Sequence, residues 1–164
     1  MNMNTPPQNL LASQLFLHGL PEPHVARLTV CARSVKVASR HRLFEEGGTA
    51  DRFWLIQAGQ VALDTMVPGR GRVIVEELGR GDVVGLSWLF PPFRWGFGAI
   101  TTQPLQAFAF DGKAIAAECD QDPEFGREML QRFLRVTLHR LQATRNRLLD
   151  VSAHPELLPW ELQP

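Results

Sequence analysis

The sequence predicts an α+β chain that is mainly β: a jelly-roll or β-roll barrel with N-terminal helices and a long C-terminal helix. Two observations carry this prediction. Short apolar runs separated by glycine-containing turns occupy residues 35–111, and many short strands at regular spacing are typical of such a barrel. Apolar residues recur with helical spacing over residues 10–31 and, for much longer, from residue 123 to about residue 151.

Eight strands are expected in the middle of the chain. Glycines mark turns at residues 47–48, 58–59, 68–71 and 79–81. The two Gly-Arg-Gly segments among them are hairpin turns rather than dinucleotide motifs, because neither opens a helix in a βαβ unit. The expected strands are residues 35–37, 41–44, 53–56, 60–64, 72–78, 82–84, 97–101 and 105–110.

The helical segments differ in length. Over residues 10–31, Pro21 and Pro23 interrupt the apolar spacing, which predicts two short helices joined by a turn. The C-terminal helix is expected to begin with Asp122 as its N-cap and Pro123 as its first residue. Its extent corresponds to a length of ~40 Å.

A heptad pattern on the long helix predicts a homodimer. Leucines recur every seven residues and interleave with a second set at three-four spacing, as in a short coiled coil. An alternative is a helix that packs along its own barrel, which accounts for the further apolar residues Phe133, Val136 and Leu138. The expected dimer residues are Leu134, Thr137, Leu141, Thr144 and Leu148.

Composition excludes several functions. Seventeen basic and seventeen acidic residues leave no net charge, which disfavours direct nucleic-acid binding. No apolar run approaches the ~20 residues of a membrane span, and no signal peptide begins the chain, so we expect a cytoplasmic protein. The five histidines are scattered, and Cys31 and Cys119 stand alone, which predicts two buried thiols and no metal site. No nucleophile, base or carboxylate pair indicates catalysis, so we expect no enzyme and no catalytic residue.

Two segments resemble cyclic-nucleotide-binding domains. Residues 43–61 are similar to the central pattern of the family, and residues 81–100 are similar to its phosphate-binding cassette. Residues 13–21 resemble its opening helical turn, and residues 140–144 resemble the long dimer helix of catabolite activator-type members. The resemblance implies a domain over residues 12–151, with an N-terminal extension at 1–11 and a tail at 152–164.

The cassette departs from the family where the family carries charge. The resemblance implies a glutamate for the ribose hydroxyl at Leu86 and an arginine for the cyclic phosphate at Trp95, with Arg94 one place early. Without these partners, one of which is a charge-assisted hydrogen bond of ~1.5–3 kcal/mol, cyclic AMP is expected to bind weakly. The candidate ligand-binding residues are Gly85, Leu86, Ser87, Arg94, Trp95, Gly96, Thr144 and Arg145.

The cassette is also rich in aromatic residues, which leaves two interpretations open. The rings fill the vacated pocket, or they form a stacking platform for a flat ligand such as adenine, nicotinamide or flavin, with Arg94 and Arg145 supplying positive charge. The rings concerned are Trp88, Phe90, Phe93, Trp95 and Phe97.

The function expected from these patterns is that of a non-catalytic regulatory or accessory subunit with a larger protein partner. Residues 87–92 and 140–145 resemble stand-alone bacterial domains, one setting of which is the NAD-reducing hydrogenase. No cofactor is expected apart from a possible nucleotide ligand. One alternative is a sensor of a nucleotide or other small anion. Another is a transcription regulator with a separate DNA-binding partner, because the tail at 152–164 is too short for a helix-turn-helix unit.

Overall fold

The computed structural model describes residues 5–153, and it divides into two compact units. The first unit extends to Glu128 and contains both β-sheets and the shorter helices. The second unit begins at Met129 and contains most of the long helix α4. The two units are built from different elements, the first from sheets and short helices and the second from one helix.

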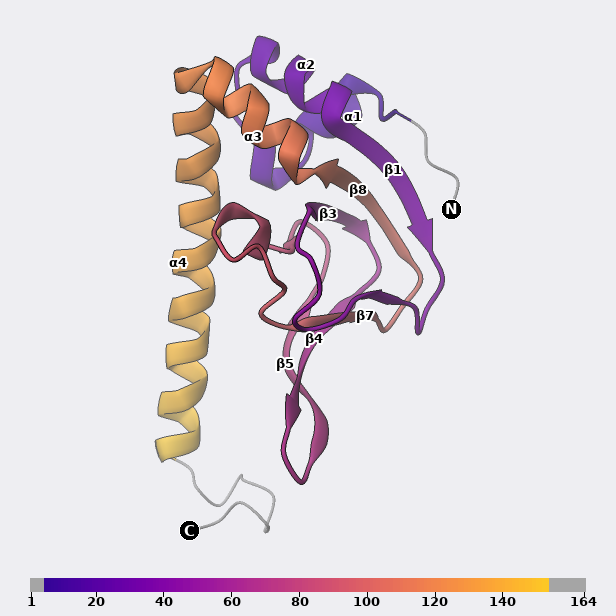
Figure 1. Ribbon diagram of the computed structural model, residues 1–164, viewed down its shortest axis with the longest axis vertical. Coiled ribbons are helices and arrows are strands. Elements are labelled where there is room, and N and C mark those ends of the chain that lie inside the picture. Colours follow the sequence, from indigo (N-terminus) through magenta and orange to yellow (C-terminus); the bar gives the residue numbers. More distant parts are fainter. Residues whose placement is uncertain (1–4, 154–164) are drawn as a thin grey trace. The chain divides into compact units, whose positions relative to one another are not determined.

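Two four-stranded antiparallel sheets form the first unit, and together they confirm the predicted fold class (Figure 1). One sheet has the strand order β1-β8-β3-β6 and the other β2-β7-β4-β5. They remain two separate sheets, so the described barrel is open. All eight predicted strands are present: β1 Ala32–Val37, β2 Arg42–Phe44, β3 Arg52–Ala58, β4 Val61–Val67, β5 Gly71–Leu78, β6 Val83–Val84, β7 Gly98–Thr101 and β8 Leu105–Asp111.

Strand β3 is the centre of the unit because both of its faces are covered. Phe53 through Ile56 are all buried, so the strand is a continuous apolar run rather than an alternating one. On one face, the ring of Phe53 stacks on Phe110 of β8 with centroids 4.5 Å apart. On the other face, Trp54 stacks on Phe44 of β2 at 5.5 Å. Aromatic pairs at these distances stabilise a core beyond the area that they bury.

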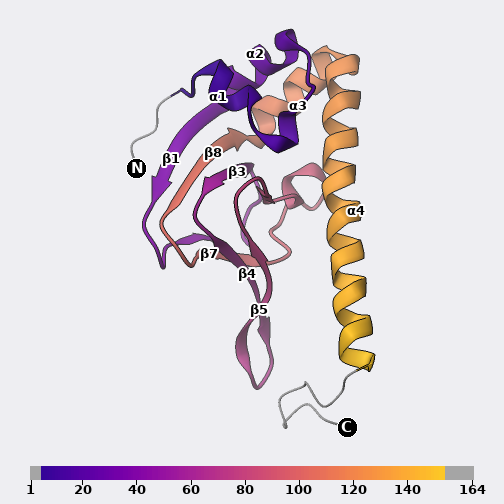
Figure 2. The same ribbon diagram turned by 180° about the vertical axis from the view of Figure 1, so that it is seen from behind.

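Helices α1 (Gln8–Ala12), α2 (Glu22–Cys31) and α3 (Gly112–Gln121) gather at one end of the sheets, beside β1 and β8 (Figures 1 and 2). A short 3₁₀ turn, Leu15–Leu17, lies between α1 and α2, so the predicted N-terminal helices are confirmed. Their apolar residues Leu11, Leu28 and Ile115 are fully buried. Helix α3 was not predicted from the sequence; its N-cap is Asp111, whose carboxylate accepts a hydrogen bond from Ala114 N at 3.0 Å.

Ionic contacts hold α2 to the segment where α3 ends and α4 begins. Arg27 of α2 donates to Glu118 Oε2 at 2.8 Å and lies 3.4 Å from Asp122 Oδ2. His24 is buried beside them, and its ring meets Phe125 edge-on at 5.4 Å. These contacts fix the start of α4 to the first unit.

Helix α4 runs over Pro123–Ala153, which gives a length of roughly 46 Å at the standard rise. Asp122 Oδ1 accepts hydrogen bonds from Glu124 N and Phe125 N, both at 3.1 Å, so the predicted N-cap is confirmed. The predicted helix end at about residue 151 agrees within two residues, which is the usual uncertainty of a helix boundary. The predicted tail at 152–164 begins in the last turn of α4, and its residues 154–164 lie outside the described residues.

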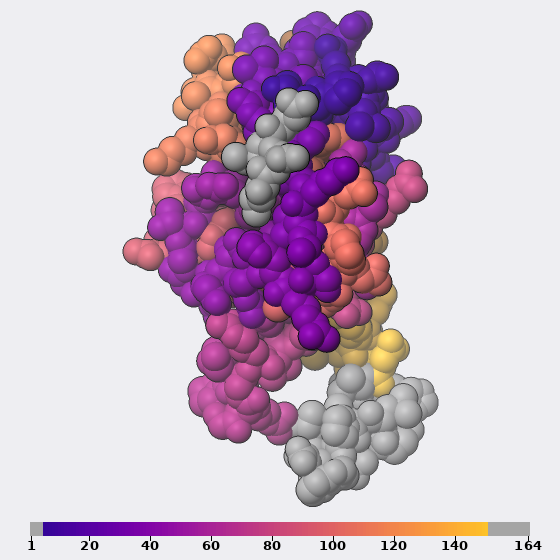
Figure 3. Space-filling view, turned by 90° about the vertical axis from the view of Figure 1, so that its right-hand side faces the viewer, coloured from indigo at the N-terminus to yellow at the C-terminus, as the bar shows by residue number. Residues whose placement is uncertain are grey.

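The β4–β5 hairpin is the most exposed part of the sheets, and in the space-filling view its magenta residues extend away from the purple body (Figure 3). Met66, Val73 and Ile74 on this hairpin are exposed, whereas Leu63 and Leu78 at its base are buried. The Gly-Arg-Gly turn at 69–71 connects the strands, as predicted.

Candidate functional site

The cassette between β6 and β7 is the segment that the sequence singled out. It turns at Gly85, forms a 3₁₀ helix over Ser87–Leu89 and continues as a loop to Phe97. Gly85, Leu86, Ser87, Arg94, Trp95 and Gly96 all lie in this cassette. The other two candidate ligand residues, Thr144 and Arg145, are adjacent exposed residues of α4 in the second unit.

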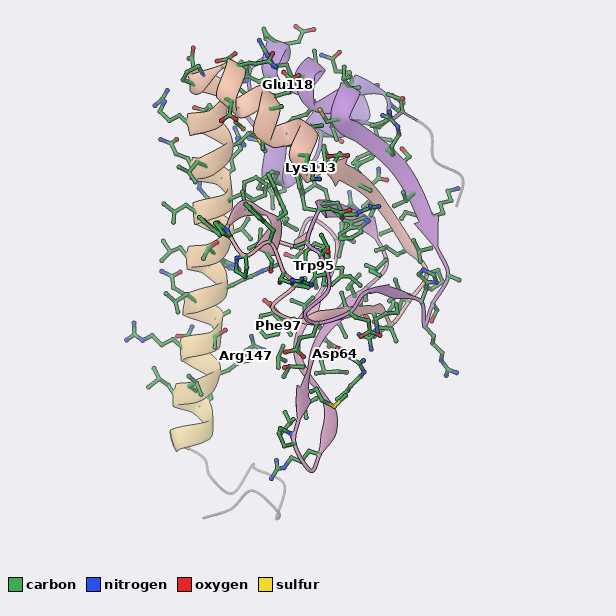
Figure 4. All side chains as sticks on the ribbon, viewed as in Figure 1. Asp64, Trp95, Phe97, Lys113, Glu118 and Arg147 are labelled. Carbon is green, nitrogen blue, oxygen red and sulfur yellow. The ribbon has the colours of Figure 1, made fainter. Side chains whose placement is uncertain are left out.

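The indole of Trp95, the residue labelled in Figure 4, lies against the turn of the cassette at Gly85. Trp95 is buried and stacks on Phe44, with ring centroids 3.9 Å apart and an interplanar angle of 18°. Gly85 has φ +85°, and a β-carbon at this position would lie 2.9 Å from Trp95 Cζ3. Only glycine accepts both the left-handed backbone and the ring edge. The tryptophan that replaces the expected arginine therefore lies directly on the main chain of the cassette turn.

Main-chain hydrogen bonds attach the cassette loop to the glycine turn at 47–50. Gly47 N donates to Trp95 O at 2.8 Å, and Trp95 N donates to Gly48 O at 2.9 Å. Ala50 N donates to Phe93 O at 2.8 Å. Because both partners are main chain, these contacts fix the position of the loop independently of a ligand.

Trp88 anchors the other end of the cassette on the opposite face of β3. Its ring stacks on Phe53 at 5.4 Å, and a β-carbon at Gly112 would lie 2.9 Å from Trp88 Cε3. Trp95, by contrast, lies on the face of Trp54 and Phe44. The single stacking platform considered from the sequence is therefore wrong, because the two tryptophans are buried on different faces of one strand. The phenylalanines Phe90, Phe93 and Phe97 are exposed.

The polar groups of the cassette bond within the first unit. Arg94 is exposed, and its Nη1 donates to the carbonyl of Gly47 at 3.0 Å. Ser87 Oγ accepts a hydrogen bond from Gly96 N at 3.3 Å. Leu86, half-buried, stands where the resemblance in the sequence places a carboxylate, and its side chain has no hydrogen-bonding group. The polar side chains of Arg94 and Ser87 therefore form hydrogen bonds within the first unit, and these bonds stabilise the conformation of the cassette.

A charged network crosses the second sheet and was missed by the sequence analysis. The buried carboxylate of Asp64 on β4 accepts from Arg42 Nη1 at 2.6 Å and from Arg72 Nη1 at 3.2 Å. Arg72 Nη2 also donates to Glu45 Oε2 at 2.7 Å, which raises the pKa of Arg72 above its ordinary value. A β-carbon at Gly98 on β7 would clash with the Asp64 carboxylate. The network joins β2, β4 and β5, and β7 makes room for it at Gly98; no sequence motif signals it because its members are far apart in the chain.

The predicted dimer residues lie on α4 with large exposed fractions. Leu134, Leu141 and Leu148 are 63%, 65% and 64% exposed, and Thr137 and Thr144 are also exposed. The Thr137 hydroxyl donates to the carbonyl of Phe133 at 3.0 Å, so its polar group is satisfied within the helix and its methyl group remains for packing. The homodimer itself stays a prediction.

The described residues contain no group of three or more histidine, cysteine or acidic side chains that could hold a metal ion. Cys31 and Cys119 are free and half-buried rather than buried. Burial raises the pKa of both thiols, and nearby carboxylates raise them further, so both thiols are protonated at neutral pH. Within the same part of the chain, no helix is long and apolar enough to cross a membrane.

Comparison with protein families identifies this architecture. The model of the cyclic nucleotide-binding domain matches residues 34–122, more than half of the chain. The chain belongs to the cyclic nucleotide-binding domain family. The match includes residues 43–61 and the cassette at 81–100, two of the segments that carry the resemblance in the sequence, and it also includes α3.

Individual relatives agree with this family. The chain is 27% identical over 142 residues to the CRP-like cAMP-activated global transcriptional regulator of Mycobacterium tuberculosis, a match that covers 87% of this chain and 62% of the regulator. A cyclic nucleotide-binding domain from Methylobacillus flagellatus KT has a TM-score of 0.80 at 18% identity, covering 96% of this chain and 90% of that one. The Thermus thermophilus catabolite activator protein has a TM-score of 0.66 at 18% identity, covering 84% and 62%. The two solved structures share the fold of this chain.

Proposed function

We propose that this domain is a regulatory or accessory module without catalytic activity that does not respond to cyclic nucleotides. One observation carries the proposal: the buried ring of Trp95 lies against Gly85, at the turn where the family receives the phosphate. Leu86 supplies no acceptor for the ribose, and Trp95 supplies no cation for the phosphate. A cyclic nucleotide would have to displace an indole that stacks on Phe44 while leaving its own charge unpaired.

The proposal assigns function to protein contacts. The cassette loop is held at both ends by buried tryptophans and presents Phe90, Phe93 and Phe97 to solvent. Exposed large apolar side chains on a rigid support are typical of an interaction surface. A larger protein partner is therefore part of the proposal, and a bacterial redox enzyme such as an NAD-reducing hydrogenase is the setting that the cassette sequence suggests.

Isothermal titration calorimetry with cyclic AMP and cyclic GMP tests the proposal. We expect no binding heat at ligand concentrations up to about 1 mM, corresponding to less than ~4 kcal/mol of binding free energy. The matched variant Leu86→Glu/Trp95→Arg restores both charged groups, and we expect it to bind more tightly than the wild type. Its folding is checked by circular dichroism. A micromolar or tighter dissociation constant for the wild type contradicts the proposal.

A second candidate is a role in transcription, favoured by the similarity to the Mycobacterium tuberculosis regulator. The chain spans 62% of the length of that relative. In this case, DNA contacts come from outside the described residues, which form two sheets with short helices and the long helix α4. Gel-shift assays with genomic DNA fragments distinguish the candidates: the protein alone is expected to shift none of them.

A further inference from the structure

Strand β1 forms an outer margin of the sheet β1-β8-β3-β6 (Figures 1 and 2). Its only strand partner among the described residues is β8, and the register between them runs from Ala32 to Val37 without a bulge. The margin strands of the other sheet, β2 and β5, both have register shifts in their pairs. A regular edge strand presents main-chain N–H and C=O groups that a further strand can use.

The hydrogen bonds of β8 show which groups of β1 face outward. At the end of the β3–β8 pair, Gly112 N donates to Asp51 O. In an antiparallel strand, the main-chain groups of successive residues point to alternate sides, so every second residue of β8 bonds to β3 and the others, among them Ala107, bond to β1. Ala107 lies opposite the residue between Ser34 and Lys36. The N–H and C=O groups of Ser34 and Lys36 therefore point away from the sheet.

Positive charge surrounds this edge. Residues 23–44 contain four arginines, one lysine and no aspartate or glutamate, and residues 101–110, which include most of β8, contain no charged residue. Arg27 and Arg42 form ion pairs with acids of the first unit. Lys36 and Arg40 are exposed, and neither forms an ion pair within residues 5–153. A molecule that binds along β1 therefore meets cations that have no acidic partner in the described chain.

Arg40, directly after β1, has an uncommon backbone conformation. Its φ is 60°, in the left-handed region where a side chain costs free energy and glycine is favoured. Arg40 N donates to Thr101 O at 2.7 Å, and the hydroxyl of Thr101 donates to Ala38 O at 2.7 Å and accepts from His41 N at 2.9 Å. These bonds fix the turn at 38–41. An arginine at a position where glycine is less strained favours a role for its side chain.

We propose that β1 pairs with an extended acidic segment of another protein, which adds a strand to the edge of the sheet. The main chain of the segment bonds to the outward groups of Ser34 and Lys36, and its carboxylates face the side chains of Lys36 and Arg40. Strand addition takes affinity from main-chain hydrogen bonds and selectivity from side chains at alternate positions. The inference rests on the proposed function, for which it adds a contact surface outside the cassette and names the chemistry of the partner.

Charge and main-chain chemistry together favour an acidic segment over other occupants of this edge. If β1 paired with β1 of a second copy, Arg33 and Lys36 of both copies would come together, and like charges across a strand pair are destabilising. A nucleic acid meets the same cations but has no peptide main chain for the outward groups of Ser34 and Lys36. An extended acidic polypeptide satisfies both requirements.

Three designed peptides test this inference on the full-length protein. Each has about eight residues. The first alternates glutamate with valine, the second alternates lysine with valine, and the third repeats the first with every main-chain nitrogen methylated. The methylated peptide keeps its carboxylates but donates no main-chain hydrogen bond, so it separates strand pairing from charge alone. We expect fluorescence anisotropy to show that the acidic peptide binds at least about tenfold more tightly than either of the others.

Hydrogen exchange locates the site of binding. The amides of Ser34 and Lys36 face outward in the free protein, so their exchange is expected to slow when the acidic peptide is bound. Binding that leaves the exchange of both amides unchanged overturns the inference.

Charge reversal on the protein supplies the control. Lys36→Glu is expected to weaken binding of the acidic peptide at least about fivefold. Arg80→Glu changes the net charge equally, at an exposed position of the turn between β5 and β6 in the same unit, and is expected to leave binding unchanged. Circular dichroism checks that both variants are folded.

Several outcomes overturn the inference. They are equal binding of the acidic peptide and either of the other two, equal effects of the two substitutions, and no binding of the acidic peptide at about 1 mM. Binding of a single-stranded DNA oligonucleotide without binding of the acidic peptide also overturns it. Calorimetry with cyclic AMP tests the proposed function separately, so failure of one is distinguishable from failure of the other.

Discussion

Single residues decide whether the cassette is a ligand site or a closed segment. Trp95 stands where the resemblance in the sequence places an arginine, and its ring is buried. Gly85 permits this close approach because it has no β-carbon. The loss of both charges at Leu86 and Trp95, with Arg94 one place early, stays a prediction from the sequence. The sequence did not predict that Trp95 stacks on Phe44 and lies tilted beside Trp54, because these three residues meet only through the fold of the sheets.

Gly98 is expected to be intolerant of any side chain. Its missing β-carbon leaves room for the Asp64 carboxylate and for Arg42 Nη1, which would lie 2.8 Å from a methyl group. We expect Gly98→Ala to reduce the free energy of unfolding by about 1–3 kcal/mol, because overpacking displaces a buried ion pair. Urea unfolding monitored by tryptophan fluorescence measures the change.

The control for that substitution lies two residues away. A β-carbon at Gly96 would have Ser87 Oγ as its nearest neighbour, 3.9 Å away, and the backbone at Gly96 is not left-handed. Gly96→Ala is therefore expected to change the free energy of unfolding by less than about 0.5 kcal/mol. Equal losses for the two variants would mean that backbone freedom, not the Asp64 network, requires glycine at position 98.

Among the elements, the strands were predictable because each is a short apolar run ended by a turn. All eight were found from the sequence within a few residues of their bounds. Helix α3 was missed because it begins at Gly112 and contains one large buried aliphatic residue, Ile115, so its apolar spacing is weak. Asp111 is both the last residue of β8 and the N-cap of α3, so no separate turn marks the boundary between the strand and the helix.

The start of α4 is expected to be sensitive to acid. Hydrogen bonds from Phe125 N and Glu124 N, with Arg27 nearby, lower the pKa of Asp122 below its ordinary value. A carboxylate with a lowered pKa contributes stability above the ordinary value, and this contribution is lost as the pH falls through the lowered one. The stability difference between the wild type and Asp122→Ala should therefore be full near neutral pH and shrink below about pH 4.

Urea unfolding at several pH values measures this difference in the free energy of unfolding. The variant Asp122→Asn separates the two contributions of Asp122, its capping hydrogen bonds and its charge near Arg27. Asparagine also accepts the capping hydrogen bonds but carries no charge for Arg27. We expect Asp122→Asn to retain part of the stability that Asp122→Ala loses, with little dependence on pH. A difference between wild type and Asp122→Ala that is constant from pH 7 to about pH 3 would contradict the assignment.

At the scale of the whole molecule, the chain combines a sheet unit that buries its apolar side chains with a long helix that exposes many of its own, and the two are expected to respond differently to substitution. Leu141 on α4 is 65% exposed, whereas Leu105 in the sheets is 1% exposed. We expect Leu141→Asp to change the free energy of unfolding by less than about 0.5 kcal/mol, and Leu105→Ala to lower it by about 2–5 kcal/mol. Trp54, Trp88 and Trp95 are buried in the sheet unit, so tryptophan fluorescence at a fixed low protein concentration reports its unfolding.

The same two substitutions are expected to have the opposite order of effects on assembly, where Leu141→Asp matters more than Leu105→Ala. A carboxylate at position 141 would be buried without a partner in a homodimer that α4 forms through Leu134, Leu141 and Leu148, so Leu141→Asp is expected to yield monomers. Leu105→Ala, studied where it remains folded, is expected to keep the oligomeric state of the wild type, because its leucine lies in the sheet unit. Sedimentation velocity measures both outcomes. A large loss of stability in Leu141→Asp with the oligomeric state unchanged would mean that this leucine serves the fold of the chain rather than its contacts with other molecules.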